Sequence, residues 1–310
     1  MTQRSLLSKI TGLLNGAGGR LQVFLEVRPD GIAWAEIAGG KSSGAGFVEC
    51  MPARRLKALQ DLVDQRHWRG AKATLVLPLD QYRVFQMERP EGIEDSELGD
   101  ALKWKLKDFL DFPPADAISD VFPFPEDASR GRGSLVNVVA ARKSLVQELV
   151  SLVRESGLKL VCIDIAELAL RNLVSALDEN GRGAALVHLR DSYGQMVVCR
   201  DDTLYLSRRL DVAADDLKDA ARQGSAVQSL ALEMQRSLDY YESQLGQVPP
   251  ATIQLVARDS SLPLASMVSS YLAVGVQMLD WSALGGDPSA DSRCLPAWSA
   301  ALAMTGGDRS

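Results

Sequence analysis

Apolar and polar positions alternate along three short runs just past the middle of the chain. These runs cover residues 185–189, 195–199 and 203–206, and the polar sequence Arg200-Asp201-Asp202 separates the second run from the third. Alternation with a period of two residues predicts β-strands, and short polar turns between such runs predict neighbouring antiparallel strands. We therefore expect a three-stranded meander in this part of the chain.

A fainter copy of this pattern lies near the start of the chain, where residues 21–37 predict a strand, a polar turn and a second strand. Aligning Glu26 with His188 also aligns Arg28 with Arg190, and a turn begins at the next residue in both copies. The repeated pattern predicts a duplicated α/β domain with two lobes.

Apolar spacing outside the meanders predicts the remaining elements of each lobe. Strands are expected at residues 73–77, 134–141, 161–165, 252–256 and 276–279. Helices are expected at residues 52–65, 144–156, 167–177, 227–244, 265–273 and 297–304. The glycine- and serine-rich sequence at residues 39–44 is predicted to be a loop. The element order βββαβα then occurs once in each lobe.

A small α/β subdomain is predicted as an insertion in the first lobe, at about residues 88–165. Residues 91–114 predict an amphipathic helix with acidic residues at its start, lysines in its middle and two prolines at its end. The aromatic sequence at residues 120–125 predicts a short extended run. The predicted organisation is an N-terminal segment and linker at 1–19, a first lobe at 20–182 and a second lobe at 183–310.

Residues 3–14 predict a short amphipathic helix, which the glycine-rich sequence at residues 15–19 ends as a flexible joint. One interpretation is peripheral association with a membrane surface or a partner. The other is a helix docked on its own domain or a frayed terminus, since so short a helix is marginal alone. The sequence leaves both interpretations open.

Composition narrows the class of protein. Hydrophobic residues make up 46% of the 310-residue chain and charged residues 24%, which is typical of a globular protein. The net charge of −6, without a basic cluster, argues against nucleic-acid binding. The four cysteines are far apart and there are only two histidines, so we expect reduced thiols in a cytoplasmic protein and no structural zinc site.

Several segments resemble a known family in residues and in order. They are ALKWKLKD at 101–108 with DVF at 120–122, AARK at 140–143, GL at 157–158 with ID at 163–164, LSR at 206–208, and EMQRSLDYY at 233–241. Together they resemble the PilM family, the actin-like proteins of type IV pilus assembly, and within it the group that serves MSHA pili.

The resemblance implies an actin-like (ribonuclease H-like) fold in which ATP lies between two lobes. In such proteins an Asp-x-Gly turn in each lobe cradles the phosphates, and a later Gly-Gly turn holds the adenosine. Glycine lets backbone amides approach a phosphate, while the aspartate organises a magnesium ion.

This sequence departs from the family pattern at all three turns. The first turn has Glu26 and Arg28 at the Asp and Gly positions, and Pro29 removes an amide donor. The second turn has His188 and Arg190, and the late turn reads VARD. We therefore predict a degenerate nucleotide site, with no catalytic residue, no metal and no ATP or other cofactor. Its residues are Glu26, Arg28, Pro29, Asp30, His188, Arg190, Asp191 and Arg258.

Two interpretations of the arginines stay open. Arginine binds phosphate without glycine, so Arg28 and Arg190 allow an altered anion site, and with it a divergent actin-like ATPase that still binds ATP. Alternatively, both arginines fill the vacated site and pair with Glu26, Asp30 or Asp191.

The resemblance also implies a partner, the cytoplasmic tail of a PilN-type inner-membrane protein, bound in a groove beside the inserted subdomain. Apolar and aromatic side chains anchor extended peptides well, and the candidates are Trp104, Phe109, Phe112, Val121, Phe122 and Phe124. Core packing is the competing interpretation for each of them.

The implied function is a non-enzymatic scaffold, located in the cytoplasm and peripheral at the inner membrane, in the platform of a type IV pilus. Other platform components are further implied partners. Self-association, which actin-like folds often show, is left open.

Overall fold

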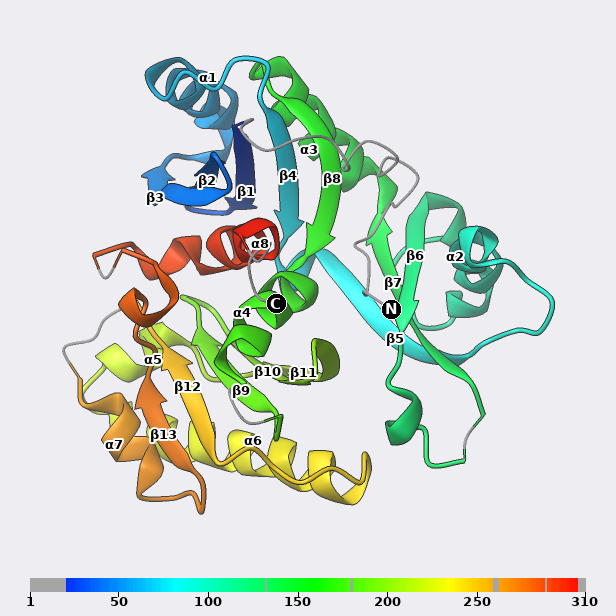
Figure 1. The fold of residues 1–310 in the computed structure, drawn as a ribbon, viewed down its shortest axis with the longest axis vertical. Coiled ribbons are helices and arrows are strands. Elements are labelled where there is room, and N and C mark those ends of the chain that lie inside the picture. Colours follow the sequence, from blue (N-terminus) through cyan, green and yellow to red (C-terminus); the bar gives the residue numbers. More distant parts are fainter. Residues whose placement is uncertain (1–20, 132, 179–180, 259–261, 288, 306–310) are drawn as a thin grey trace. The chain divides into compact units, whose positions relative to one another are not determined.

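The computed structural model describes residues 21–131, 133–178, 181–258, 262–287 and 289–305 (Figure 1). The amphipathic segment predicted at residues 3–14 lies outside these ranges. Contacts divide the chain into two compact units. The first contains Met1–Phe124, Arg132–Ala169 and Cys294–Ser310, and the second contains Pro125–Gly131 and Leu170–Arg293. Within the described ranges, no helix has the length and apolar character needed to cross a membrane.

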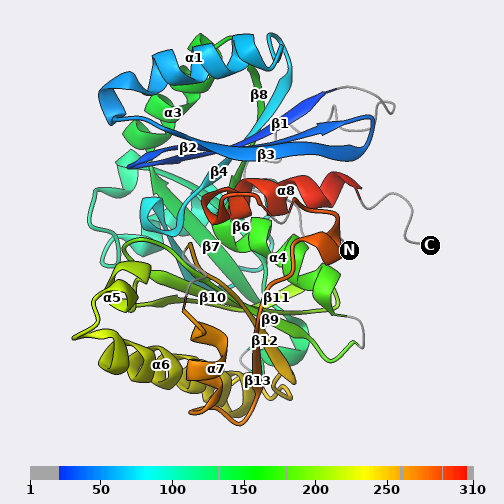
Figure 2. The same cartoon turned by 90° about the vertical axis from the view of Figure 1, so that its left-hand side faces the viewer.

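The first unit is built on a five-stranded sheet with the order β3-β2-β1-β4-β8. Its strands are β1 (Gln22–Arg28), β2 (Gly31–Ala38), β3 (Lys41–Glu49), β4 (Lys72–Leu77) and β8 (Lys159–Ile165). The first three are antiparallel neighbours, as the meander predicts, and β1, β4 and β8 are parallel. Helices α1 (Arg55–Gln65) and α3 (Lys143–Glu155) cover one face and α8 (Leu295–Thr305) covers the other (Figure 2). Both faces of β1 are therefore buried.

The second unit repeats this order as β11-β10-β9-β12-β13. Its strands are β9 (Ala184–Leu189), β10 (Gly194–Arg200), β11 (Thr203–Leu210), β12 (Thr252–Val256) and β13 (Gly275–Met278). Its helices are α5 (Ala214–Lys218), α6 (Gln223–Ser243) and α7 (Leu264–Ser269), and α4 (Ala166–Leu177) leads in from the first unit. The identical strand order confirms the predicted duplication.

The registers also confirm the alignment of the two central strands. Glu26 on β1 lies beside Val76 near the end of β4, and His188 on β9 lies beside Val256 at the end of β12. Both residues therefore stand at the carboxyl end of a parallel pair, where α/β folds usually place ligand sites.

The inserted subdomain is a three-stranded sheet with the order β5-β7-β6 and the helix α2. Its elements are β5 (Tyr82–Glu88), α2 (Asp95–Lys103), β6 (Ala117–Pro123) and β7 (Leu135–Arg142). Leu98, Leu102 and Leu106 pack against Val136, Val138 and Ala140, which alternate along one face of β7. The opposite face of β7 carries Val139 and Ala141.

The domain boundaries differ from the predicted ones in three places. Helix α8 returns to the first unit, because its apolar residues pack on β1 and β2, so the second unit ends at Arg293. The insertion spans β5 to β7, since β8 joins the main sheet and α3 packs on β8. Residues 125–131 belong to the second unit.

Two local predictions were wrong, and one strand was not predicted. Residues Lys41–Gly44, predicted to be a loop, belong to β3. The Trp34 ring lies against this strand at Gly44 and Gly46, where there is no side chain. A Cβ at Gly46 would come 2.9 Å from the ring. Helix α2 ends at Lys103 and continues as one 3-10 turn, Trp104–Leu106, which brings Leu106 into the core. The sequence analysis also missed β5.

We predict that Gly99→Ala destabilises the inserted subdomain. A Cβ at Gly99 would lie 2.7 Å from the carbonyl oxygen of Ser119 on β6, so α2 must move away from the sheet. The expected cost is about 1–3 kcal/mol, more than the helix propensity gained. The matched control is Gly224→Ala in α6, where the new Cβ meets nothing within 4 Å. Urea unfolding should show a lower midpoint for Gly99→Ala and an equal or higher one for Gly224→Ala; equal midpoints for both would contradict the close packing.

Candidate functional site

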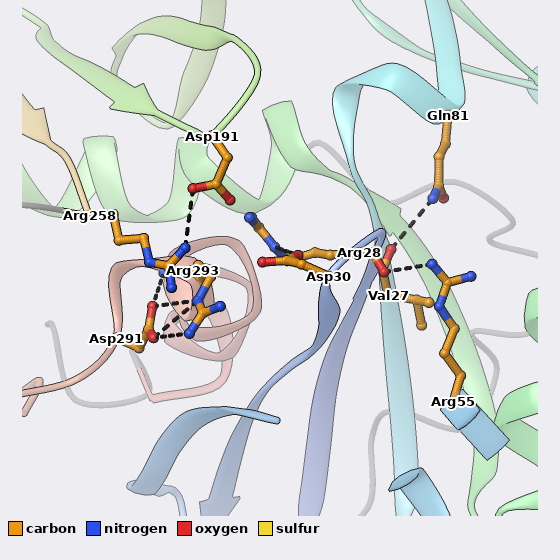
Figure 3. A network of polar contacts seen from close by, with 9 residues as sticks. All are labelled: Val27, Arg28, Asp30, Arg55, Gln81, Asp191, Arg258, Asp291 and Arg293. Atoms are coloured by element: carbon orange, nitrogen blue, oxygen red, sulfur yellow. Dashed lines mark hydrogen bonds and ion pairs between the residues drawn. The ribbon is translucent and has the colours of Figure 1, made fainter. Parts of the chain in front are cut away.

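The turn between β1 and β2 gathers the first-unit residues of the predicted nucleotide site. Arg28 pairs with Gly31 in the strand register, so the turn consists of Pro29 and Asp30 alone. Arg28 is 3% exposed, and its Nε donates to Asp30 Oδ1 at 3.0 Å (Figure 3). Its guanidinium also lies over the Phe47 ring, 5.8 Å from the centroid. This arginine is therefore held inside its own hairpin by a carboxylate and an aromatic ring.

Side chains from neighbouring elements hold the end of β1. Arg55 Nη2 donates to the carbonyl oxygen of Arg28 at 2.6 Å, and Gln81 Nε2 donates to that of Val27 at 3.4 Å (Figure 3). Pro29 has no N–H and the Asp30 carbonyl accepts from the amide of Cys50. A turn of this kind offers a phosphate few backbone donors.

The corresponding turn of the second unit is longer. Leu189 pairs with Gly194, and the Arg190 amide donates to the carbonyl of Tyr193 at 2.8 Å, which closes a four-residue turn. Arg190 is 6% exposed, and its guanidinium lies 5.3 Å from the centroid of the Tyr193 ring. The guanidinium of Arg209 lies 4.2 Å from the same centroid. The Arg190 carbonyl accepts from the amide of Ala214, which begins α5. His188 is buried on β9.

Carboxylates accompany two further arginines of the second unit. Arg258, which follows β12, donates to Asp191 at 3.4 Å, and Arg293 contacts Asp291 through two nitrogens at 2.7–3.1 Å (Figure 3). Burial alone would raise the pKa of Asp291, but hydrogen bonds from Arg293 and the charge of Arg258 lower it. The two carboxylates are therefore engaged with guanidinium groups.

Within the described ranges, no group of three or more His, Cys, Asp or Glu side chains is placed to hold a metal ion. Arg28 and Arg190 are buried, and Arg28 is paired with Asp30. Arg28 therefore has a carboxylate and an aromatic neighbour within its own unit, and Arg190 has an aromatic one.

The first unit contains a hollow at the junction of the inserted sheet and the main sheet. Its lining comes from β4, β6, β7, β8 and α3, and consists of Leu77, Ile118, Ser119, Asp120, Val139, Ala141, Val146 and Ile163. The walls are mostly apolar, and the Asp120 side chain, which accepts the amide of Val121 at 2.8 Å, supplies a carboxylate. β6 is at the end of the strand order in its sheet. The hollow is small and mostly apolar, and Asp120 is the one acidic residue in its lining.

The predicted aromatic anchors divide into two groups. Phe122 and Phe124 are buried, and Val121 packs on the core of the subdomain, so core packing explains these three. Trp104 and Phe109 are 61% and 66% exposed, and Phe112 is partly buried under the Arg142 guanidinium. None of the six lines the hollow.

Sequence reasoning missed the hollow and the residues that hold the end of β1. The nearly continuous apolar run at residues 135–142 was a usable signal, because a strand that is apolar at nearly every position is buried on both faces. Arg55, Gln81, Asp291 and Arg293 had no comparable signal, since their roles depend on contacts made by the fold.

Comparison with known proteins supports an actin-like fold. Neither the protein-family models nor the curated proteins include a match to the sequence. A structure of a PilM–PilN type IV pilus biogenesis complex aligns with a TM-score of 0.69 and 20% identity, over 92% of this chain and 97% of that chain.

Two further structures align with TM-scores of 0.52. The cytoplasmic domain of EpsL, an inner-membrane component of the type II secretion system of Vibrio cholerae, is 13% identical over 90% of this chain and 93% of that one. A Bacteroides thetaiotaomicron protein with an actin-like ATPase fold and unknown function is 10% identical, over 84% and 91%. At these identities the comparisons establish the fold, which confirms the predicted fold class.

We predict that the Arg28–Asp30 pair stabilises the first hairpin. Asp30→Asn removes the charge next to a buried guanidinium and should lower the free energy of unfolding by about 1 kcal/mol, a modest value because Asp30 is partly exposed. Adding Arg28→Met to Asp30→Asn should recover most of that loss, since the buried charge is then removed as well.

A double-mutant cycle measured by urea unfolding tests this coupling. Asp61→Asn, which breaks the exposed Lys57–Asp61 pair on α1, is the matched control and should leave stability nearly unchanged. Strictly additive effects of the Arg28 and Asp30 substitutions would show that the pair contributes nothing.

Proposed function

We propose that this protein is a non-enzymatic scaffold of a type IV pilus assembly platform, which binds the cytoplasmic tail of a PilN-type membrane protein. The observation that carries the proposal is the alignment with the PilM–PilN complex over nearly the whole of both chains. The EpsL alignment supports the same class, because EpsL is an inner-membrane component of a secretion system. On this proposal the protein works in the cytoplasm, at the inner membrane.

The hollow in the first unit is the proposed binding site for the tail. Extended peptides bind well where an apolar pocket lies beside a sheet edge, since the edge orients the backbone and the pocket takes a side chain. β6 is the outer strand of its sheet, with α2 packed against it at Ser119, and Val139, Ala141, Val146 and Ile163 supply apolar walls. Asp120 favours a tail that carries a lysine or arginine next to its apolar anchor.

The segment resemblance favours the MSHA pilus group, and we propose that the protein serves as its PilM-like component, the role of the biogenesis protein MshI. Binding to other platform components and self-association remain predictions.

We also propose that the two hairpins bind no ATP and no magnesium. Buried arginines at both former glycine positions, the Arg28–Asp30 and Arg258–Asp191 pairs and the proline in the first turn support this view. The second candidate is a divergent ATPase of the pilus machine, which the buried positive charge at the hairpins favours.

Filling the hollow should block tail binding. Ala141→Leu places extra carbons in the space between β7 and α3, and we expect the affinity for a synthetic tail peptide of the PilN-type protein from the same organism to fall about tenfold or more. Asp120→Asn should weaken binding about threefold to tenfold. Fluorescence anisotropy with labelled peptide measures both.

Trp104→Ala and Phe109→Ala serve as matched controls, since both side chains are exposed and lie outside the hollow. Both variants should bind the peptide as the wild type does. If they lose binding while Ala141→Leu retains it, the tail docks on the exposed aromatic residues instead. A charge at the buried Phe122 is unsuitable as a test, because it would disrupt the core.

Calorimetric titration with magnesium-ATP should give no binding heat at millimolar nucleotide. Arg190→Gly and Arg28→Gly should not create binding, because the metal-organising aspartates are also missing from both turns. Micromolar affinity in the wild type, lost in Arg190→Glu, would instead establish the ATPase candidate.

A further inference from the structure

The connection between β6 and β7 is longer than a hairpin requires. Residues 124–134 separate Pro123 from Leu135, whereas two to five residues commonly suffice for antiparallel neighbours. Part of this connection, Pro125–Gly131, belongs to the second unit, although both strands belong to the first. The extra length therefore carries the chain into the second unit and back.

Asp127 lies at the centre of a polar network within the second unit. Its carboxylate accepts hydrogen bonds from Arg200 Nη2 at 2.6 Å, from the Tyr205 hydroxyl at 2.9 and 3.0 Å, and from Gln247 Nε2 at 3.1 Å. Two of these groups come from the ends of β10 and β11, and the third follows α6. One side chain of the connection is thus held by three separate parts of the second unit.

The partners of Asp127 also contact one another. Arg200 donates to the side-chain oxygen of Gln247 and, at 2.8 Å, to the Tyr205 hydroxyl, and its guanidinium lies 5.0 Å from the centroid of the Tyr205 ring. Arg130, three residues after Asp127, donates to the carbonyl of Ser243 near the end of α6. The connection therefore has two polar attachments to the second unit.

The protonation states keep this network intact at neutral pH. Burial alone would raise the pKa of Asp127, but hydrogen bonds from Tyr205, Arg200 and Gln247 lower it, so the carboxylate is charged. Burial and the bond to Asp127 raise the pKa of Tyr205, so the phenol keeps its proton. The side chain of Asp127 is 47% exposed, which makes the attachment easier to open than a buried ion pair.

We propose that residues 125–131 act as a releasable strap, which couples the second unit to the β6–β7 hairpin and so regulates the tail pocket that this hairpin lines. The choice of ligand rests on the proposed function, whereas the strap itself does not. One residue separates β6 from the strap and three separate the strap from β7. Release of the strap therefore loosens Ile118, Asp120, Val139 and Ala141 of the pocket.

Limited trypsin digestion of the full chain tests the strap, since Arg130 is an exposed cleavage site within it. Arg200→Ala removes the main partner of Asp127 without changing the strap sequence, and cleavage after Arg130 should become about tenfold faster as the open population grows. Tyr205→Phe, which keeps the ring and loses the hydroxyl contact, should give an intermediate rate.

Arg222→Ala is the matched control, because this arginine of the second unit pairs with Asp216 and Asp219 and not with the strap. Its cleavage rate should equal that of the wild type, and all variants should keep the wild-type melting midpoint. Equal cleavage rates in Arg200→Ala and Arg222→Ala would overturn the strap.

Coupling to the pocket has two readouts. Hydrogen exchange of β6 and β7 should speed up in Arg200→Ala and not in Arg222→Ala, and this measurement needs no peptide. Binding of the synthetic tail peptide should weaken about threefold to tenfold in Arg200→Ala. Unchanged hydrogen exchange and unchanged peptide affinity in Arg200→Ala would overturn the coupling. If exchange of β6 and β7 speeds up in Arg200→Ala but the wild type binds no tail peptide, only the proposed function is contradicted.

Discussion

A buried guanidinium follows or ends the central strand of each unit, and its need for compensation constrains the hairpin around it. Removing such a group from water is costly unless hydrogen bonds, a counter-charge or an aromatic face replace the lost solvation. Arg28 obtains Asp30 and the Phe47 ring, and Arg190 lies over the Tyr193 ring. In each hairpin a carboxylate or aromatic side chain of the turn is thus engaged with an arginine of its own unit.

The two units share one strand order and diverge where the strands end. The first hairpin closes with two residues and the second with four, and the longer turn ties its carbonyl to the start of α5. Sheet order depends on the apolar residues along the strands, which both units retain. Turn chemistry depends on a few residues at the ends, so it can change while the fold is kept.

Sequence reasoning succeeded where one segment determines its own structure. Period-two alternation predicted the second meander and the first two strands of the first one, and apolar spacing predicted α1, α3, α6 and α8 to within a few residues. It failed for β3, whose glycines are explained only by the Trp34 ring against them. It also missed the hollow, because Ile118 and Ala141 face it only through the pairing of β6 with β7. The Arg258–Asp191 contact joins residues far apart in sequence, which no local pattern reports.

The inserted sheet shows how a hollow and a stable core share the two faces of one strand. On β7, Val136, Val138 and Ala140 pack against α2, while Val139 and Ala141 on the other face line the hollow. Both sets are almost fully buried, so both contribute to folding. A polar or charged residue on either face would cost stability before it changed any binding. Changes in volume, which leave the apolar character of the strand intact, are therefore the way to alter this pocket without unfolding the sheet that forms it.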